Sequence, residues 1–558
     1  MLKKHWIFFV TLLVFLLLLA KNPFSVRTLI PNFEPYPDTI HYINPALSFI
    51  HGHGLQLFRD GRALQTNVPP LYSLVLSPIF LIKNDVRMFY IINILLAIGS
   101  FTFLYLILLK ITKSAMIRFF ALFLYATNFF IYWYPSLAMA ENLTLFLFIA
   151  GIYLLTLSVT KKNVVLAAVI SIGFYAVKYA SIPLTGFYFL CYFVKIYLSF
   201  QGKNTKNEKT KGIIYLLILT CTAGITFLCY SYWEWTTKGT TLLVTLLSVF
   251  IPQKSRTLLS SGSWFSLQYL PTHLPEYLKA VRGGYKLRFL WDDTPIIPIF
   301  IGVPGMIGLF LGMLKKEVRL LSVSLVVLLL SSIVFMSTFY AVDMRYLYHA
   351  IPTLLIGFVL FWEIIMKTLD SRVRENDKKK LLKKSSLSSS GLTRGSMIVF
   401  TLLLVFLFFF YLATNIVRIK TQISTNLRYA ETPWYYLSVV KLNEYFKEYK
   451  NKPYVISAMS PYYVDFFSSN NYLLLPMSPS QDFFRMGTAA VWGKENYSDL
   501  KKLYIEKIGQ GKEVYMVNYL GNDENIRKDV DKIRQDFVLT LVSEGCYGSC
   551  NIWKVNIK

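Results

Sequence analysis

The chain has 558 residues, of which 54% are hydrophobic and 16% aromatic, and its mean hydropathy is +0.46. These values exclude an ordinary soluble enzyme and indicate a membrane protein with many spans. Lys and Arg total 58 against 31 Asp and Glu, a formal net charge of +27, but the basic residues cluster between apolar runs, as in cytoplasmic loops, which excludes nucleic acid as a partner. The clusters are KITK (110–113), TKK (160–162), KNTKNEKTK (203–211), KKEVR (315–319) and RVRENDKKKLLKK (372–384).

The opening segment, MLKKHWIFFVTLLVFLLLLA, has the charged start and apolar core of a secretory signal. No small-residue cleavage site follows, because the next residues are Lys21, Asn22 and Pro23. We therefore predict an uncleaved first span with a cytoplasmic N-terminus.

The other spans follow from the length of the apolar runs, because a helix needs roughly 20 such residues to cross a hydrocarbon core of ~30 Å. With the basic clusters placed inside, the sequence predicts about eleven crossings and an extracytoplasmic C-terminus. Two long outer loops lie at about 21–87 and 232–295. The short runs 163–178 and 181–199 decide the parity, since a single crossing there would turn the basic loops outward. The crossings lie near 6–20, 88–109, 115–133, 141–159, 163–178, 181–199, 212–231, 296–314, 320–339, 351–367 and 397–414.

The composition changes after about residue 415. The runs KPYVISAMS, NYLLLPMS and KEVYMVNYL are typical of short strands, and they alternate with helical patterns such as SDLKKLYIEKIGQG. FVLTLVSEGCYGSCNIWKV indicates a terminal hairpin. The predicted fold is thus a polytopic α-helical membrane domain (1–414) followed by a small extracytoplasmic α/β domain (415–558).

The five cysteines are too few for a disulfide scaffold. Cys191, Cys221 and Cys229 lie in apolar runs, where a small hydrophobic role is expected. Cys546 and Cys550 flank the hairpin turn, and three states remain open for them: a disulfide in an oxidising exterior, two free thiols, or part of a metal site.

Ionisable side chains at the outer ends of the predicted spans are the strongest functional signal, because a charge at membrane depth is costly and usually faces a cavity or a partner. Carboxylates that meet a lysine and an arginine at one membrane face suggest a site that binds an anionic lipid headgroup and moves a proton. The set comprises Glu34, Asp38, Glu141, Lys178, Asp343 and Arg345.

Each side-chain type suits one task. The guanidinium of Arg345 offers a planar fork of donors, which favours it as the phosphate ligand, with Lys178 as an auxiliary point charge. An acceptor hydroxyl or amine needs a base, and an aligned carboxylate could supply about 10²–10⁴-fold in rate. Asp38 suits this role because Pro35 and Pro37 hold the preceding chain extended.

Purely structural roles remain open for the same residues. Asp38 could cap a helix, and Glu141 could stabilise a helix N-terminus. Lys178 could extend its ammonium group to the membrane interface. Arg345 could anchor the chain by pairing with Asp343, although an outward-facing arginine opposes the charge rule.

A transporter or lipid-carrier flippase is the alternative function, because it would also be polytopic and basic inside. Transporters usually place ionisable or helix-breaking residues near the midplane and contain paired repeats. Here the charges gather at one predicted face, the outer loops are long, and no repeat at half-length is evident.

Four stretches in the same order resemble the C-type glycosyltransferase (GT-C) superfamily, in the branch that contains the protein O-mannosyltransferases and the lipid A aminoarabinose transferase. The similarity covers roughly residues 5–370. The stretches are Asp38, Tyr42, Ala46, Gly52 and Gly54, then PPLYSLVLSPIF (69–80), AMAENLTLFLFIAGIYLL (138–155) and MRYLYHAIPTLLI (344–356).

The resemblance implies transfer of a sugar from a polyprenyl-phosphate carrier to a lipid, glycan or protein acceptor at the non-cytoplasmic face, and the residue usage suits a bacterial plasma membrane. Mannosyltransferases carry an Asp-Glu pair in the first outer loop, whereas Asp38 precedes Thr39, which argues against protein mannosylation. The implied site residues are Asp38 and Glu141 for catalysis and Glu34, Tyr42, Lys178, Arg345 and Tyr346 for substrate binding.

The resemblance assigns no cofactor and leaves a divalent metal open. His41, His51 and His53 could ligate one, but their spacing matches no strong template, and no metal ligand is assigned.

Overall fold

The structure is a computed structural model, and the chain divides into two compact units. The transmembrane unit comprises Met1–Lys21, Gln65–Lys254 and Ser261–Arg428, and the sheet unit comprises Asn22–Leu64, Ser255–Ser260 and Tyr429–Lys558. The sheet unit thus takes in much of the first predicted outer loop. The described residues are 2–20, 38–59, 62–64, 68–83, 85–201, 205–238, 265–283, 296–339, 342–382, 390–427, 441–458, 471–477, 496–517, 524–545 and 551–558.

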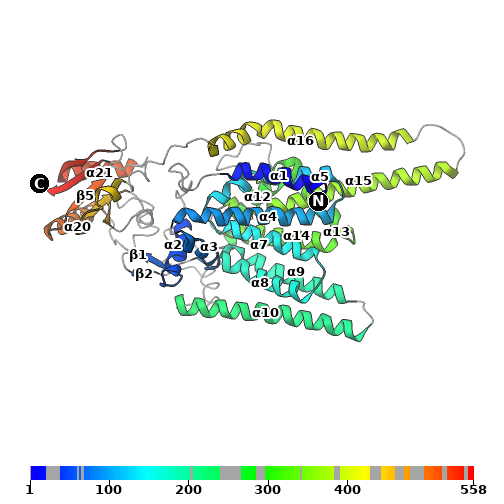
Figure 1. Cartoon of the computed structure of the whole chain (residues 1–558), viewed down its shortest axis with the longest axis horizontal. Coiled ribbons are helices and arrows are strands. Elements are labelled where there is room, and N and C mark those ends of the chain that lie inside the picture. The colour runs from blue at the N-terminus through cyan, green and yellow to red at the C-terminus, as the bar shows by residue number, and fades with distance from the viewer. Residues whose placement is uncertain are drawn as a thin grey trace. The chain divides into compact units, whose positions relative to one another are not determined.

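The transmembrane unit is built from helices, and every predicted crossing coincides with one helix or, for 115–133, with a bent pair (Figure 1). Within the described ranges, six helices are long and apolar enough to cross a membrane, or seven if α5 and α6, bent by 57°, form one span. The chain is therefore a multi-pass membrane protein. The helices are α1 (Leu2–Leu19), α4 (Phe89–Ile111), α5 (Ala115–Thr127), α6 (Phe129–Trp133), α7 (Glu141–Thr156), α8 (Lys161–Val177), α9 (Ile182–Phe200), α10 (Lys206–Lys238), α13 (Ile299–Leu314), α14 (Arg319–Ser337), α15 (Ala350–Leu382) and α16 (Ser390–Leu427).

The pair that decides the parity, α8 and α9, forms two separate helices that pack on each other, with α10 beside both (Figure 1). Lys178, just after α8, pairs with Glu141 at the start of α7. Lys195, near the end of α9, donates instead to the carbonyls of Leu154 and Leu157 at the far end of α7. The two helices therefore run in opposite directions along α7, as two crossings require.

The far end of α7 holds two lysine ammonium groups. Lys195 Nζ lies 2.7 Å from the Leu154 carbonyl oxygen, and Lys110 Nζ lies 3.0 Å from that of Thr156. The last carbonyls of a helix have no partner within it, and cations at this end also complement the helix dipole. The two lysines therefore cap α7.

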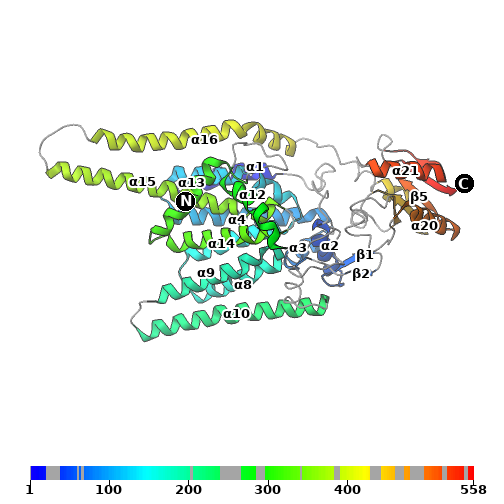
Figure 2. The ribbon, with the colours of Figure 1, turned by 180° about the vertical axis from the view of Figure 1, so that it is seen from behind.

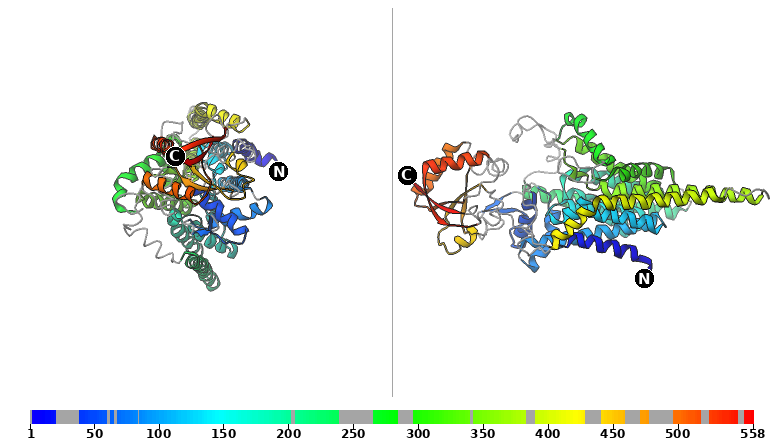
Figure 3. Two further views of the ribbon diagram at one scale, coloured as in Figure 1. Left: turned by 90° about the vertical axis from the view of Figure 1, so that its left-hand side faces the viewer. Right: turned by 90° about the horizontal axis from the view of Figure 1, so that it is seen from above.

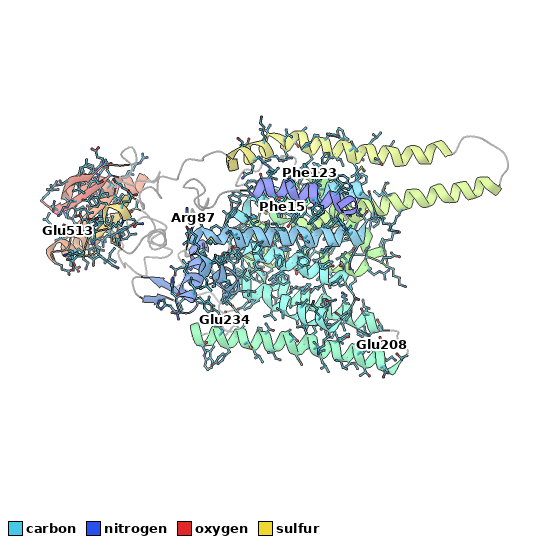
Figure 4. The ribbon with its side chains drawn as sticks, viewed as in Figure 1. Phe15, Arg87, Phe123, Glu208, Glu234 and Glu513 are labelled. Atoms are coloured by element: carbon cyan, nitrogen blue, oxygen red, sulfur yellow. The ribbon has the colours of Figure 1, made fainter. Side chains whose placement is uncertain are left out.

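Aromatic side chains fill the contacts among α1, α4, α5 and α16. The ring of Phe15 on α1 is stacked 5.4 Å from Phe101 on α4 and also meets Tyr125 on α5. Phe123 on α5 meets Phe408 on α16 at 5.1 Å, centroid to centroid, and Figure 4 labels Phe15 and Phe123 in this region. These contacts join helices that are far apart in the sequence.

Glycines allow backbone contact between α13 and α15, which lie side by side in Figure 2. A Cβ atom on Gly308 would lie 1.9 Å from the carbonyl oxygen of Gly357, and one on Gly305 would lie 2.5 Å from that of Leu354. Small residues let membrane helices approach until their backbones touch. This contact fixes the start of α15, which follows Arg345 in the chain.

Two further helices lie in the long loops of the transmembrane unit, where the sequence analysis assigned no helix: α3 (Leu71–Ile82) and α12 (Leu270–Arg282). In the sheet unit, α2 (Asp38–Ile50) begins at Asp38, where the sequence analysis considered a helix cap, and it contains Pro45. A short hairpin of β1 (Leu57–Arg59) and β2 (Arg62–Leu64) follows it.

The sheet unit carries a five-stranded sheet of order β4-β3-β5-β7-β6, drawn in yellow-orange to red in Figure 3. β3 runs parallel to β4 and β5, while β7 runs antiparallel to β5 and to β6, the predicted terminal hairpin. Helices α20 and α21 add buried apolar side chains to its core. The elements are β3 (Tyr454–Ser457), β4 (Leu473–Pro476), β5 (Val514–Val517), β6 (Phe537–Ser543), β7 (Ile552–Ile557), α20 (Tyr497–Gly509) and α21 (Glu524–Asp536).

The predicted fold class, a polytopic helical protein with a small C-terminal α/β part, is therefore confirmed. The three predicted strand runs, the helix in SDLKKLYIEKIGQG and the terminal hairpin all form. Cys546 and Cys550 lie outside the described residues, whereas Cys191 is buried and Cys221 and Cys229 are exposed.

The α13–α15 contact predicts the effect of one added methyl group. Gly308→Ala should lower the stability of the purified protein by about 1–3 kcal/mol, because the Cβ would collide with a backbone that cannot move aside. Gly224→Ala on α10 is the matched control, since nothing lies within 4 Å of its Cβ position. Thermal unfolding in detergent measures both, and equal midpoints would contradict the close contact.

Candidate active site

Charged side chains from three segments of the transmembrane unit line one pocket. Glu141 is the first residue of α7, Lys178 follows the last residue of α8, and Arg345 lies in the short 3-10 helix η6 (Met344–Leu347). The full lining is Glu141, Thr144, Leu145, Lys178, Ala180, Ser181, Leu184, Ser332, Arg345, Tyr346, Tyr348 and His349.

The carboxylate of Glu141 is the centre of this charge cluster. Its side chain is 3% exposed, and its Oε1 accepts a hydrogen bond from Lys178 Nζ and lies 3.9 Å from Arg345 Nε. Burying a charge without a partner is costly, so the carboxylate and the ammonium group hold each other in place. The Oε2 atom of Glu141 is buried and has no hydrogen-bond partner among the described residues.

The side chain of Arg345 contacts both Asp343 and Tyr346. Its Nε pairs with Asp343 Oδ2 at 2.5 Å, while Asp343 Oδ1 accepts from the Arg345 backbone N–H and so caps η6. The ring of Tyr346 lies beside both cations, 4.7 Å from Lys178 Nζ and 5.1 Å from Arg345 Cζ. These cation–π contacts orient the two groups in the pocket.

An irregular buried segment sets the position of Glu141. Residues 137–140, just before α7, are buried and not helical. The side-chain amide of Asn142 donates to the carbonyls of Tyr134, Leu137 and Met139. Backbone groups at membrane depth must be satisfied internally, and Asn142 does this one residue after Glu141.

A second asparagine supports the same segment from α4. Asn93 Nδ2 donates to the carbonyls of Pro135 and Leu137 at 3.0 and 2.7 Å. Its own Oδ1 accepts from the hydroxyl of Tyr72 on α3 at 2.7 Å. Side chains from α3, α4 and α7 therefore fix the segment before α7. The sequence analysis did not identify these contacts, because Asn93 and Asn142 lie within apolar runs.

A buried carboxylate on α10 anchors the turn that follows Lys178. After Lys178 the chain forms a 3-10 turn, η4 (Tyr179–Ser181), and the Tyr179 hydroxyl donates to Glu234 Oε1 at 2.9 Å. Tyr230 donates to the same oxygen at 3.2 Å, and Glu234, labelled in Figure 4, is fully buried. The sequence analysis did not identify this anchor, which lies in the aromatic run YSYWEW (230–235).

Four of the predicted site residues thus lie together in the transmembrane unit: Glu141, Lys178, Arg345 and Tyr346. The Arg345–Asp343 pair considered in the sequence analysis also forms, next to the pocket.

The other three predicted residues belong to the sheet unit. Asp38 is the first residue of α2, but its side chain lies outside the described part of the chain, as does Glu34. Tyr42 is buried on α2, with 2% of its surface exposed. The assignments of Asp38, Glu34 and Tyr42 to the site stay predictions.

No group of three or more His, Cys, Asp or Glu side chains could hold a metal ion within the described ranges. His41 is half-buried, and His51 and His53 are exposed.

Two solved structures of ArnT, the lipid A aminoarabinose transferase, from Cupriavidus metallidurans are similar to this chain. The one bound to undecaprenyl phosphate superposes with a TM-score of 0.57 at 11% sequence identity, over 99% of this chain and 98% of ArnT. The apo form gives 0.55 at 11% identity, over 100% and 98%. No protein-family model and no curated protein sequence matches the chain.

The chain therefore has the GT-C fold, that of a class of membrane glycosyltransferases, and the predicted resemblance is confirmed at the level of the fold. Its similarity to ArnT spans nearly the whole length of both chains.

The buried ion pair predicts a non-additive mutant cycle. Lys178→Met should destabilise the protein by about 3–5 kcal/mol, because it leaves the Glu141 carboxylate buried without its main partner. Adding Glu141→Gln should recover most of the loss, since the remaining amide carries no charge. Thermal unfolding of both single variants and the double variant measures the coupling, and a double variant as unstable as the sum of its parents would contradict the pairing.

The asparagine contacts predict a second loss of stability. Asn142→Ala leaves buried carbonyls without donors, at about 1–3 kcal/mol for each group that finds no new partner. Asn163→Ala is the matched control, because its amide makes one exposed bond, to Ser158. Unfolding midpoints should fall for the first variant and stay near wild type for the second.

Proposed function

We propose that the chain is a membrane glycosyltransferase that moves a sugar from a polyprenyl-phosphate carrier to a lipid, glycan or protein acceptor at the non-cytoplasmic face of a bacterial plasma membrane. The observation that carries the proposal is the meeting of Lys178, Arg345 and the buried Glu141 in one pocket of a GT-C fold. The ArnT structure with undecaprenyl phosphate adds support, because that protein binds a carrier lipid of the proposed class.

The two cations suit the carrier phosphate. In the transfer, the acceptor oxygen or nitrogen attacks the anomeric carbon, the bond from this carbon to the phosphate oxygen breaks, and polyprenyl phosphate leaves with the bonding electrons. Negative charge grows on the phosphate during this step. Arg345 and Lys178 would stabilise that charge, and because their positions are fixed before the reaction, little reorganisation is needed.

Glu141 and Asp38 take different parts in this proposal. Glu141 is engaged by Lys178, so its contacts favour a role in orienting the cations. Asp38 would accept the proton of the acceptor hydroxyl or amine, as the first outer loop of related enzymes implies. Tyr346 would support both cations, while Glu34 and Tyr42 would contact the sugar or the acceptor.

Asp38→Asn tests the proposed base. Transfer of a labelled sugar from its polyprenyl phosphate, measured in membrane vesicles with release of polyprenyl phosphate as a second readout, should fall about 10²–10⁴-fold at normal protein level. Asp531→Asn is the matched control, because the Asp531 side chain is 64% exposed on α21 and should leave transfer unchanged. Undiminished transfer by Asp38→Asn would reject the base. A wild-type protein that moves the intact lipid-linked sugar without releasing polyprenyl phosphate would point to a flippase.

A further inference from the structure

His349 lines the same pocket and has no part in the chemistry above. It directly precedes α15, and its side chain is buried, with 4% of its surface exposed. Its ring lies 5.1 Å from that of Phe148, centroid to centroid. The Nε2 atom is buried and has no hydrogen-bond partner in the described part of the structure. Buried polar atoms in native proteins are almost always bonded, so Nε2 awaits a ligand.

The charges in the pocket and beside it are balanced before any ligand enters. Lys178 and Arg345 carry two positive charges, and Glu141 and Asp343 carry two negative ones. A phosphate group that enters the pocket therefore adds negative charge that the existing pairs do not neutralise.

The neutral groups in the lining cannot supply that charge. The hydroxyls of Thr144 and Ser332 donate to carbonyls of their own helices, and the Tyr348 hydroxyl donates to the Phe130 carbonyl. Tyr346 already lies against both cations. Histidine is the side chain whose ordinary pKa allows it to gain a proton between pH 5 and 8.

We propose that His349 is a further ligand of the carrier phosphate and takes up a proton when that phosphate binds. This inference rests on the proposed function, which supplies a polyprenyl phosphate as the anion. The proton comes from solvent and binds to the imidazole ring, and the resulting imidazolium donates through Nε2 to a phosphate oxygen. No covalent bond forms or breaks in this step.

The titration of His349 in the empty pocket is consistent with this role. Burial lowers its pKa to about 4, so the imidazole is neutral at physiological pH. A phosphate beside Nε2 would stabilise the charged form and raise this pKa. Affinity should then increase as pH falls through the pKa of the bound state, and the increase should end near the lower pKa of the free state.

Binding of polyprenyl phosphate to the full chain in detergent, measured from pH 8 to pH 5, tests the proposal. His349→Gln keeps a polar group in the position of Nε2 but cannot gain a proton. The ratio of wild-type to variant affinity should rise as pH falls, by up to tenfold per pH unit. The ligand itself titrates near pH 6, and the ratio cancels that contribution. A ratio that does not change with pH overturns the proposal.

A second ligand keeps the test independent of the variant. Polyprenyl methyl phosphate is a phosphodiester with no group that titrates near pH 6. Wild-type affinity for it should still increase as pH falls, and an affinity that is constant from pH 8 to pH 5 overturns the proposal even if His349→Gln does not fold.

Inorganic phosphate in the same assay separates the two sources of the anion. If the affinity ratio depends on pH with inorganic phosphate, the pocket recognises the phosphate group alone. If the ratio depends on pH only with polyprenyl phosphate, the prenyl chain is needed as well. Both results support the role of His349. Wild-type protein that binds neither ligand overturns the proposed function as well, whereas binding with a constant ratio overturns the role of His349 alone.

Discussion

A carboxylate that is almost fully buried, that of Glu141, imposes the central constraint on the transmembrane unit. Such a charge is tolerated only beside an opposite charge, so the chain must bring Lys178 to it from another helix. Arg345 joins the same carboxylate from a third segment. The need to neutralise this carboxylate therefore brings the start of α7, the end of α8 and η6 together. The two cations that result line the pocket.

The surrounding structure makes this arrangement rigid. Asn93 and Asn142 satisfy the irregular backbone before α7, which would otherwise be unstable at membrane depth. Glu234 anchors the turn after Lys178 through the hydroxyl of Tyr179. On the other side, backbone contact at Gly308 fixes α15 and with it the segment that carries Arg345. Polar contacts and close packing thus place groups that hydropathy alone could not position.

The sequence predicted the features that arise from local chemistry. The length of the apolar runs predicted the membrane helices. The cost of a charge at membrane depth identified Glu141, Lys178 and Arg345 as candidate site residues. The hydrogen bonds of Asn93 and the place of His349 in the pocket depend on residues far away in the chain, so no local pattern identified them. The hairpin at 57–64 was missed because its strands have three residues each, too few for a periodic signal.

The lysine caps at the far end of α7 affect how the pocket can respond to a ligand. Lys110 and Lys195 hold that end, while Lys178 holds the other, so an axial slide of α7 would break contacts at both ends at once. These contacts therefore keep α7 from moving along its own axis. Its first residue, Glu141, therefore stays at one depth in the bundle, within reach of Lys178.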